Sequence, residues 1–131
     1  MISVATLGSH CALQLLKGAR DEGLKTLLIC EKKRVGLYQR FKFIDELIIV
    51  DSFSEILEQK CESVLRKNNS ILIPHGTLIA QMNSEQIESI KTPVFGNKHI
   101  LRWESDRTLK EQLMKEAKLE TPKSIPNPKE I

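Results

Sequence analysis

The sequence predicts an α/β fold, in which helices cover both faces of a parallel sheet of about five strands. Short apolar runs of strand length alternate along the chain with longer stretches whose apolar residues recur at helical spacing. Several of these runs are apolar throughout, which is typical of strands covered on both faces. Strands that alternate with helices favour parallel pairing through right-handed crossovers.

Five apolar runs are expected to form the strands. They are residues 2–5, 26–30, 47–50, 70–73 and 93–95. The expected helices cover residues 10–22, 54–67, 76–82 and 84–90, and a last helix opens at Ser105 and Asp106. Gly23 stands where a helix C-cap belongs, and Ser54 is a suitable N-cap. Residues 31–41 stay unassigned.

Size and composition indicate one globular domain. A chain of 131 residues can bury its own core, and 40% hydrophobic with 28% charged residues is typical of soluble proteins. The net charge of +3 suits a small anionic ligand but is too weak to indicate nucleic acid. No apolar run approaches the roughly 20 residues that span a bilayer, so no membrane partner is expected.

The spacing of cysteines and histidines argues against a disulfide framework or a metal site. The three cysteines are far apart and form no CxxC pair, which favours a reduced, cytoplasmic protein. The three histidines match no zinc-binding pattern and have no carboxylate cluster beside them. No metal ligand and no catalytic residue is assigned.

Two loops are expected to meet at the ligand-binding edge of the sheet. A strand order of 3-2-1-4-5 reverses between the strands at 2–5 and 70–73, and open α/β sheets bind ligands at such a point. The loops that follow these strands are Gly8-Ser9-His10 and Pro74-His75-Gly76-Thr77. Each contains a glycine, a hydroxyl residue and a histidine, so we expect a nucleotide-like ligand between them.

Both loops also have a purely structural interpretation. Ser9 could hydrogen-bond a ligand, or it could only cap the following helix, with His10 an ordinary residue of the first turn. Gly76 could allow close backbone approach and Thr77 could bind the ligand, or the loop could only end a strand, with Thr77 as a cap. Lys32-Lys33-Arg34 could close over a phosphate or form a solvated face. GxGxxG and GxxxxGK[ST] patterns are absent.

Several strings in the chain resemble one family over essentially its whole length. They are Thr6-Leu7-Gly8-Ser9-His10, Leu16-Lys17-Gly18-Ala19, Tyr38-Gln39-Arg40-Phe41-Lys42, Ile73-Pro74-His75-Gly76-Thr77, Phe95-Gly96-Asn97 and Ile100-Leu101-Arg102-Trp103-Glu104-Ser105. Their order and spacing resemble the N-terminal region of the archaeal PurP-type enzymes. These are formate-dependent 5-formaminoimidazole-4-carboxamide ribonucleotide synthetases of purine (IMP) biosynthesis.

The resemblance implies an ATP-grasp ligase that formylates AICAR (5-aminoimidazole-4-carboxamide ribonucleotide) with formate and ATP, through formyl phosphate. Residues 1–121 would be its Rossmann-like pre-ATP-grasp domain, and 122–131 the start of a proline-rich linker. His10 and Thr77 match the AICAR-binding positions of the family. Gly8, Ser9, His75 and Gly76 would support them. A homo-oligomer is left open.

The chain departs from the family pattern at some positions. Thr77 stands where serine is more common, and Lys98 and His99 replace two arginines, whose forked geometry they do not reproduce. The ATP-grasp and central domains would follow the tail, so ATP and Mg²⁺ would bind in the complete enzyme and not to this chain, which alone is expected to be inactive. The alternatives are a stand-alone, non-catalytic nucleotide or phospho-sugar binding module and an assembly module.

Overall fold

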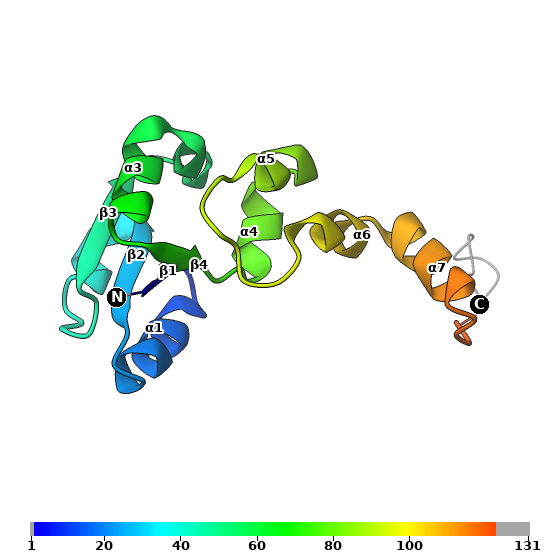
Figure 1. Ribbon diagram of the computed structural model, residues 1–131, viewed down its shortest axis with the longest axis horizontal. Coiled ribbons are helices and arrows are strands. Elements are labelled where there is room, and N and C mark those ends of the chain that lie inside the picture. Colours follow the sequence, from blue (N-terminus) through cyan, green and yellow to red (C-terminus); the bar gives the residue numbers. More distant parts are fainter. Residues whose placement is uncertain (1, 123–131) are drawn as a thin grey trace. The chain divides into compact units, whose positions relative to one another are not determined.

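A computed structural model describes residues 2–122 of the chain (Figure 1). The chain divides into two compact units, residues 1–98 and residues 99–131. The first unit contains the sheet and both predicted loops. Of the predicted linker at 122–131, all but Pro122 lies outside the described residues.

The sheet of the first unit has four parallel strands in the order β3-β2-β1-β4. They are β1 (Ser3–Leu7), β2 (Lys25–Glu31), β3 (Glu46–Val50) and β4 (Ser70–Leu72). In register, Leu7 lies opposite Ile29, and Ala5 lies opposite Leu72. The α/β class and the order of these strands are therefore confirmed, and the carboxyl ends of β1, β2 and β4 share one edge.

The prediction of a fifth strand at 93–95 is wrong. Val94 forms only an isolated parallel bridge with Leu72, although it lies on the expected side of β4. Pro93 has no N–H to donate, so its backbone contributes only a carbonyl, which accepts from Leu72 N at 2.8 Å. Gly96, with φ of 90°, turns the chain away directly afterwards.

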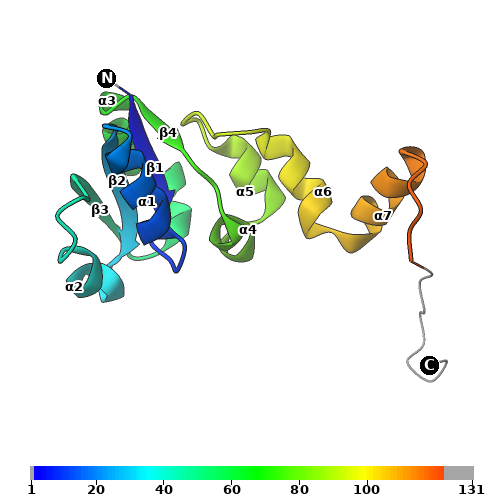
Figure 2. The same cartoon turned by 90° about the horizontal axis from the view of Figure 1, so that it is seen from below.

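Helices cover both faces of the sheet. In Figures 1 and 2, α1 and α3 lie on opposite sides of the sheet. The helical elements of this unit are α1 (Ala12–Asp21), η1 (Lys32–Arg34), α2 (Val35–Tyr38), η2 (Phe53–Leu57), α3 (Gln59–Lys67), α4 (Gly76–Gln81) and α5 (Ser84–Ser89). Ala12 and Leu16 of α1 pack with Val4, Leu28 and Cys30 of the sheet.

Two helix boundaries test the expected caps. Gly23 lies just past α1 with φ of 74°, and its N–H donates to the Arg20 carbonyl at 2.9 Å, which confirms it as a terminator. Ser54 is not the cap that was expected. Ser52 caps η2 in a capping box with Glu55, and an extended residue at Glu58 separates η2 from α3, so the stretch 54–67 is not one helix.

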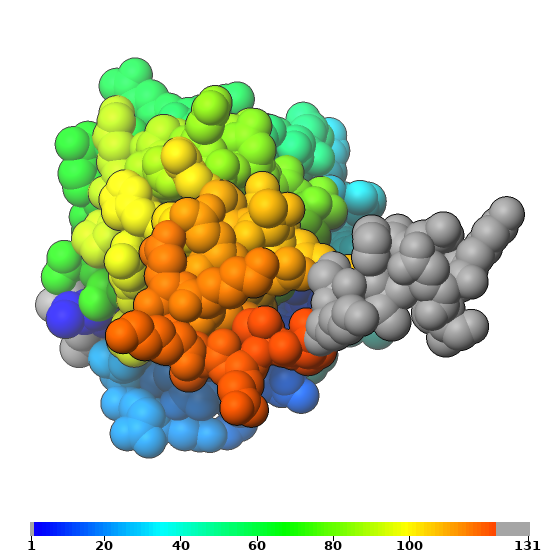
Figure 3. All heavy atoms as spheres, turned by 90° about the vertical axis from the view of Figure 1, so that its right-hand side faces the viewer, coloured from blue at the N-terminus to red at the C-terminus, as the bar shows by residue number. Residues whose placement is uncertain are grey.

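The second unit is described by itself. It contains α6 (Leu101–Ser105) and α7 (Arg107–Glu116), and η3 (Lys98–Ile100) spans its boundary. Asp106 caps α7 by accepting from Thr108 N at 2.8 Å and Leu109 N at 3.2 Å, as the sequence predicts. Every residue in 99–122 keeps some exposure, and Figure 3 shows these atoms in amber to red. Within residues 2–122, no helix has the length and apolar character needed to cross a membrane.

Candidate functional site

The two predicted loops leave neighbouring strands at the same edge of the sheet (Figure 2). Beyond the β1–β4 ladder, Ile73 N donates to the Ala5 carbonyl at 2.8 Å, and the Thr6 hydroxyl donates to the Ile73 carbonyl at 2.9 Å. Thr6 is fully buried. These bonds hold the carboxyl ends of β1 and β4 together up to the points where the loops begin.

The loops contact each other directly through their hydroxyl residues. Thr77 Oγ1 donates to Ser9 Oγ at 2.7 Å, across a sequence separation of 68 residues. Ser9 is only 5% exposed, whereas Thr77 is half-buried. The structure therefore brings Ser9 and Thr77 together, as the predicted strand order requires.

His75 joins the same two loops with its imidazole ring. Its Nε2 lies 3.0 Å from the Leu7 carbonyl, and its Nδ1 accepts from Thr77 N at 3.3 Å. Because a carbonyl only accepts, Nε2 is the ring nitrogen that carries a proton, and the Nδ1 lone pair accepts from the Thr77 N–H. Both ring nitrogens are thus occupied by the protein, so His75 orients the second loop.

Neither Ser9 nor Thr77 is the helix cap that the structural interpretation proposed. Cys11 is the N-cap of α1 and has no side-chain capping bond, while Ser9 contributes only its carbonyl to the helix, accepting from Ala12 N at 3.0 Å. The N-cap of α4 is His75, not Thr77. Both hydroxyls are therefore used in the contact between the loops.

Gly8 allows the first loop to pass close to β2. Its N–H donates to the Ile29 carbonyl at 2.7 Å. A Cβ atom at this position would lie 3.1 Å from Tyr38 Cε2, 3.2 Å from Ile29 O and 3.4 Å from Cys30 Cα. Gly76 differs, because it is exposed and a Cβ there would meet no atom within 4 Å. The close packing around the first loop therefore requires a glycine at position 8, whereas the space around Gly76 would accommodate a larger residue.

Tyr38 is a site residue that the sequence reasoning missed. Its hydroxyl donates to the Ser9 carbonyl at 3.1 Å, and the residue is 2% exposed. Burial raises the pKa of Tyr38, and a hydrogen bond and the positive charge from Arg34 partly oppose this. Its position in the chain could have indicated this role, because residues 31–41 follow β2, whose carboxyl end lies beside that of β1.

His10 lies on the turn between β1 and α1, with its side chain exposed.

Neither Cys30 nor Cys61 has an activated thiol. Burial raises the pKa of both, that of Cys61 to about 11. Within residues 2–122, no three side chains of the metal-binding types gather into a group that could hold an ion.

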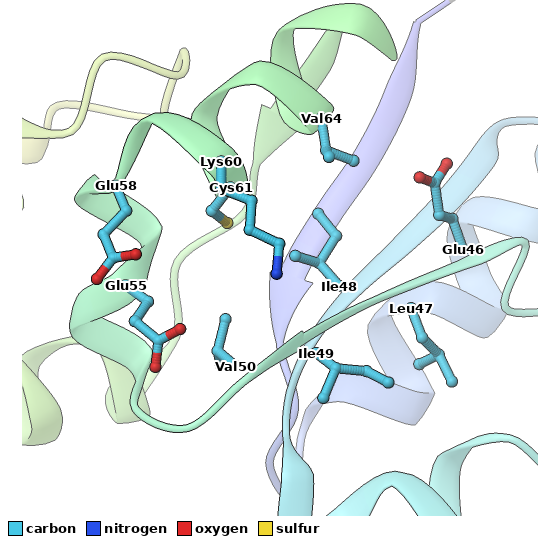
Figure 4. Close-up of a pocket in the computed structure, with 10 residues that line it drawn as sticks. All are labelled: Glu46, Leu47, Ile48, Ile49, Val50, Glu55, Glu58, Lys60, Cys61 and Val64. Carbon is cyan, nitrogen blue, oxygen red and sulfur yellow. The ribbon is translucent and has the colours of Figure 1, made fainter.

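A separate cavity of about 250 Å³ lies between β3 and α3 (Figure 4). Its lining residues are Glu46, Leu47, Ile48, Ile49, Val50, Glu55, Glu58, Lys60, Cys61 and Val64. None of them belongs to either predicted loop. The cavity and the loop site are therefore different features of this unit.

The geometry defines a parallel α/β domain with two hydroxyl-bearing loops joined at its topological switch point. The chain belongs to the family described as "Protein of unknown function (DUF1246)", whose model matches residues 4–125. The resemblance drawn from the sequence is confirmed by relatives that match 95–100% of this chain.

Two of these relatives are named 5-formaminoimidazole-4-carboxamide-1-(beta)-D-ribofuranosyl 5'-monophosphate synthetase. The protein from Nitrosopumilus maritimus is 70% identical over 131 residues, which are 100% of this chain and 38% of the relative. The one from Methanothermobacter thermautotrophicus is 48% identical over 99% of this chain and 36% of the relative. The chain thus spans little more than a third of these relatives.

Solved structures show the same fold. The crystal structure of the IMP biosynthesis protein PurP from Thermococcus kodakaraensis matches 95% of this chain and 39% of its own, with a TM-score of 0.79 and 31% identity. A biotin carboxylase domain of a thermophilic 2-oxoglutarate carboxylase matches 91% of this chain and 29% of its own, with a TM-score of 0.66 and 14% identity. The second match concerns the fold alone.

Proposed function

We propose that this chain is the AICAR-binding N-terminal part of an ATP-grasp ligase, which joins formate to the amine of AICAR. The observation that carries the proposal is the Thr77–Ser9 hydrogen bond, which joins the two loops predicted to bind the ligand. The relatives' names support it, because a 5-formamino ribotide is the product of formylating a 5-amino ribotide.

The hydrogen-bonding capacity of the site suits such a ligand. When Ser9 accepts from Thr77, the Ser9 hydroxyl keeps its own proton to donate, and Thr77 Oγ1 keeps its lone pairs to accept. The exposed His10 imidazole adds a donor or acceptor beside them. AICAR presents a carboxamide, ribose hydroxyls and a phosphate, all of which form such bonds. His10 and Thr77 are proposed as the AICAR contacts, with Gly8, Ser9, His75 and Gly76 supporting them.

ATP, Mg²⁺ and formate are proposed to bind in regions of the longer relatives that this chain does not cover. Within residues 2–122, no three candidate metal ligands form a group. The proposed partners are small molecules in the cytoplasm, without nucleic acid or a membrane.

Calorimetric titration of AICAR into the chain, alone and within the longest natural polypeptide that contains it, tests the proposal. We expect binding, and a loss of about tenfold in affinity for His10→Ala, because leaving a bound polar group without its partner costs about 1–3 kcal/mol. The His99→Ala variant is the matched control, since it removes an exposed histidine of the second unit. Absence of AICAR binding in both polypeptides would overturn the proposal.

A further inference from the structure

The basic turn η1 follows β2 at the edge of the sheet that carries the proposed site. Leu7 and Ile29 are opposite each other, and Gly8 N donates to the Ile29 carbonyl. The residues that follow Ile29 therefore begin beside the first loop. Within five residues of Ile29 the chain reaches three successive cations, Lys32, Lys33 and Arg34.

A series of polar contacts connects this turn to the site. The Arg34 side chain lies close enough to the Tyr38 hydroxyl to lower its pKa, and that hydroxyl donates to the Ser9 carbonyl at 3.1 Å. Ser9 Oγ in turn accepts from Thr77 Oγ1 at 2.7 Å. Arg34, Tyr38, Ser9 and Thr77 thus form one connected path across the ends of β2, β1 and β4.

The charge of this turn is only partly compensated. Glu31 is the carboxylate that meets it, at 3.0 Å from Lys33 Nζ and 3.8 Å from Arg34 Nε. One carboxylate against three cations leaves an excess positive charge at the site. The distance from Arg34 exceeds that of a hydrogen bond, and the Arg34 side chain is 45% exposed, so its guanidinium can take a further anionic partner.

We infer that Arg34 binds the phosphate of the ribotide, an inference that rests on the proposed function. A phosphate monoester carries a charge of about −1.5 to −2 at neutral pH, and guanidinium pairs with phosphate through two parallel N–H···O bonds. His75 cannot serve, because both of its ring nitrogens already bond the protein. Tyr38 acts as a positioning residue, since its buried ring and hydroxyl hold the Arg34 side chain beside the first loop.

The experiment compares AICAR with its unphosphorylated riboside, titrated into the wild type and into Arg34→Gln, Arg34→Lys and Lys33→Gln, in the longest natural polypeptide that contains the chain. We expect Arg34→Gln to weaken AICAR about tenfold or more, equivalent to about 1.4 kcal/mol, and to change riboside affinity less than about twofold. Arg34→Lys restores part of the loss, because lysine keeps the charge without the fork.

Lys33→Gln is the matched control, since it removes one charge from the same turn at a side chain that is 70% exposed. It should weaken AICAR less than about threefold, as expected for a screened surface charge. Equal losses for Lys33→Gln and Arg34→Gln, or an equal loss of riboside and AICAR affinity in Arg34→Gln, would overturn the inference. If His10→Ala weakens AICAR and Arg34→Gln does not, this inference fails and the proposed function stands. If the wild type binds neither compound, the proposed function fails first.

Discussion

Thr77 Oγ1 and Ser9 Oγ are joined by a hydrogen bond of 2.7 Å between two loops that are 68 residues apart. Both loops are needed for the proposed site. The contact exists because β4 pairs with β1 in parallel, which places their carboxyl ends together. The hydroxyl at position 77 therefore holds the two loops together, and we propose that it also binds the ligand.

Thr77→Val is expected to lower the free energy of unfolding by about 1 kcal/mol, because it keeps the shape of the side chain and removes the hydrogen bond to Ser9. Urea denaturation measures this change, and calorimetry with AICAR measures the accompanying loss of affinity. Thr77→Ser, which retains the hydroxyl, is the control and should stay close to wild type in both. A Thr77→Val protein that matches wild type in stability and affinity contradicts this prediction.

Gly8→Ala is expected to destabilise the protein by about 1–3 kcal/mol, because the new methyl group would lie too close to the Tyr38 ring and the Ile29 carbonyl. Thermal and urea denaturation report the change. The control is Gly18→Ala, within α1, where a Cβ meets no atom within 4 Å. That substitution should stabilise the protein by about 0.5–1 kcal/mol, since alanine favours a helix over glycine. Equal effects at the two positions would show that the close approach at Gly8 is unimportant.

Asp45 gives the stability a dependence on pH. Burial raises the pKa of this carboxyl, but the Thr26 N–H and the Arg20 guanidinium, both at 2.8 Å, outweigh burial and lower its pKa overall. A carboxyl with a lowered pKa in the folded state stabilises the fold at pH values above its unfolded pKa of about 3.9. This contribution is lost as the pH falls through the lower, folded value.

Asp45→Asn should therefore reduce stability most at pH 6–7, and its difference from wild type should shrink below about pH 4. Urea denaturation over this pH range measures it. Asp21→Asn, which breaks only the exposed pair with Lys17, is the control and should have little effect at any pH. A constant difference between Asp45→Asn and wild type across the range would contradict the assignment.

The three thiols should differ in reactivity. Cys30 and Cys61 are buried, and the pKa of Cys61 is raised to about 11, so it stays protonated at pH 8. Cys11 is partly exposed. A thiol-specific reagent should modify Cys11 first in the folded protein and all three after denaturation, as mass spectrometry of the labelled peptides would show. Cys11→Ser should then remove the fast phase, and rapid labelling of Cys61 would contradict its burial.

The sequence was sufficient for those parts of the fold that depend on local patterns. Apolar runs predicted the four strands, and the alternation of strands with helices predicted their parallel order, which placed Ser9 near Thr77. The run at 93–95 was misleading, because its apolar residues suggest a strand while Pro93 and Gly96 leave only one bridge. The cap at Ser52 was missed because Ser54 has the same chemistry two residues later.

The part of the site that the sequence did not reveal depends on long-range packing. Tyr38 reaches Ser9 only because β2 lies beside β1 and α2 returns the chain over the same edge. Nothing in the local pattern of residues 31–41 indicates this return. Lys98 stands where the family pattern has an arginine. Its ammonium group donates to the Ile90 carbonyl at 2.7 Å, and this contact likewise could not be predicted from the residues next to it in sequence.

The separation between Ser9 and Thr77 has a consequence for biosynthesis. A chain emerging from the ribosome exposes its first loop long before the second loop exists, and β1 lacks one of its two neighbours until β4 is made. If the proposed function holds, a ribotide present during translation would bind only chains whose first unit is complete, and would protect those chains selectively from proteolysis.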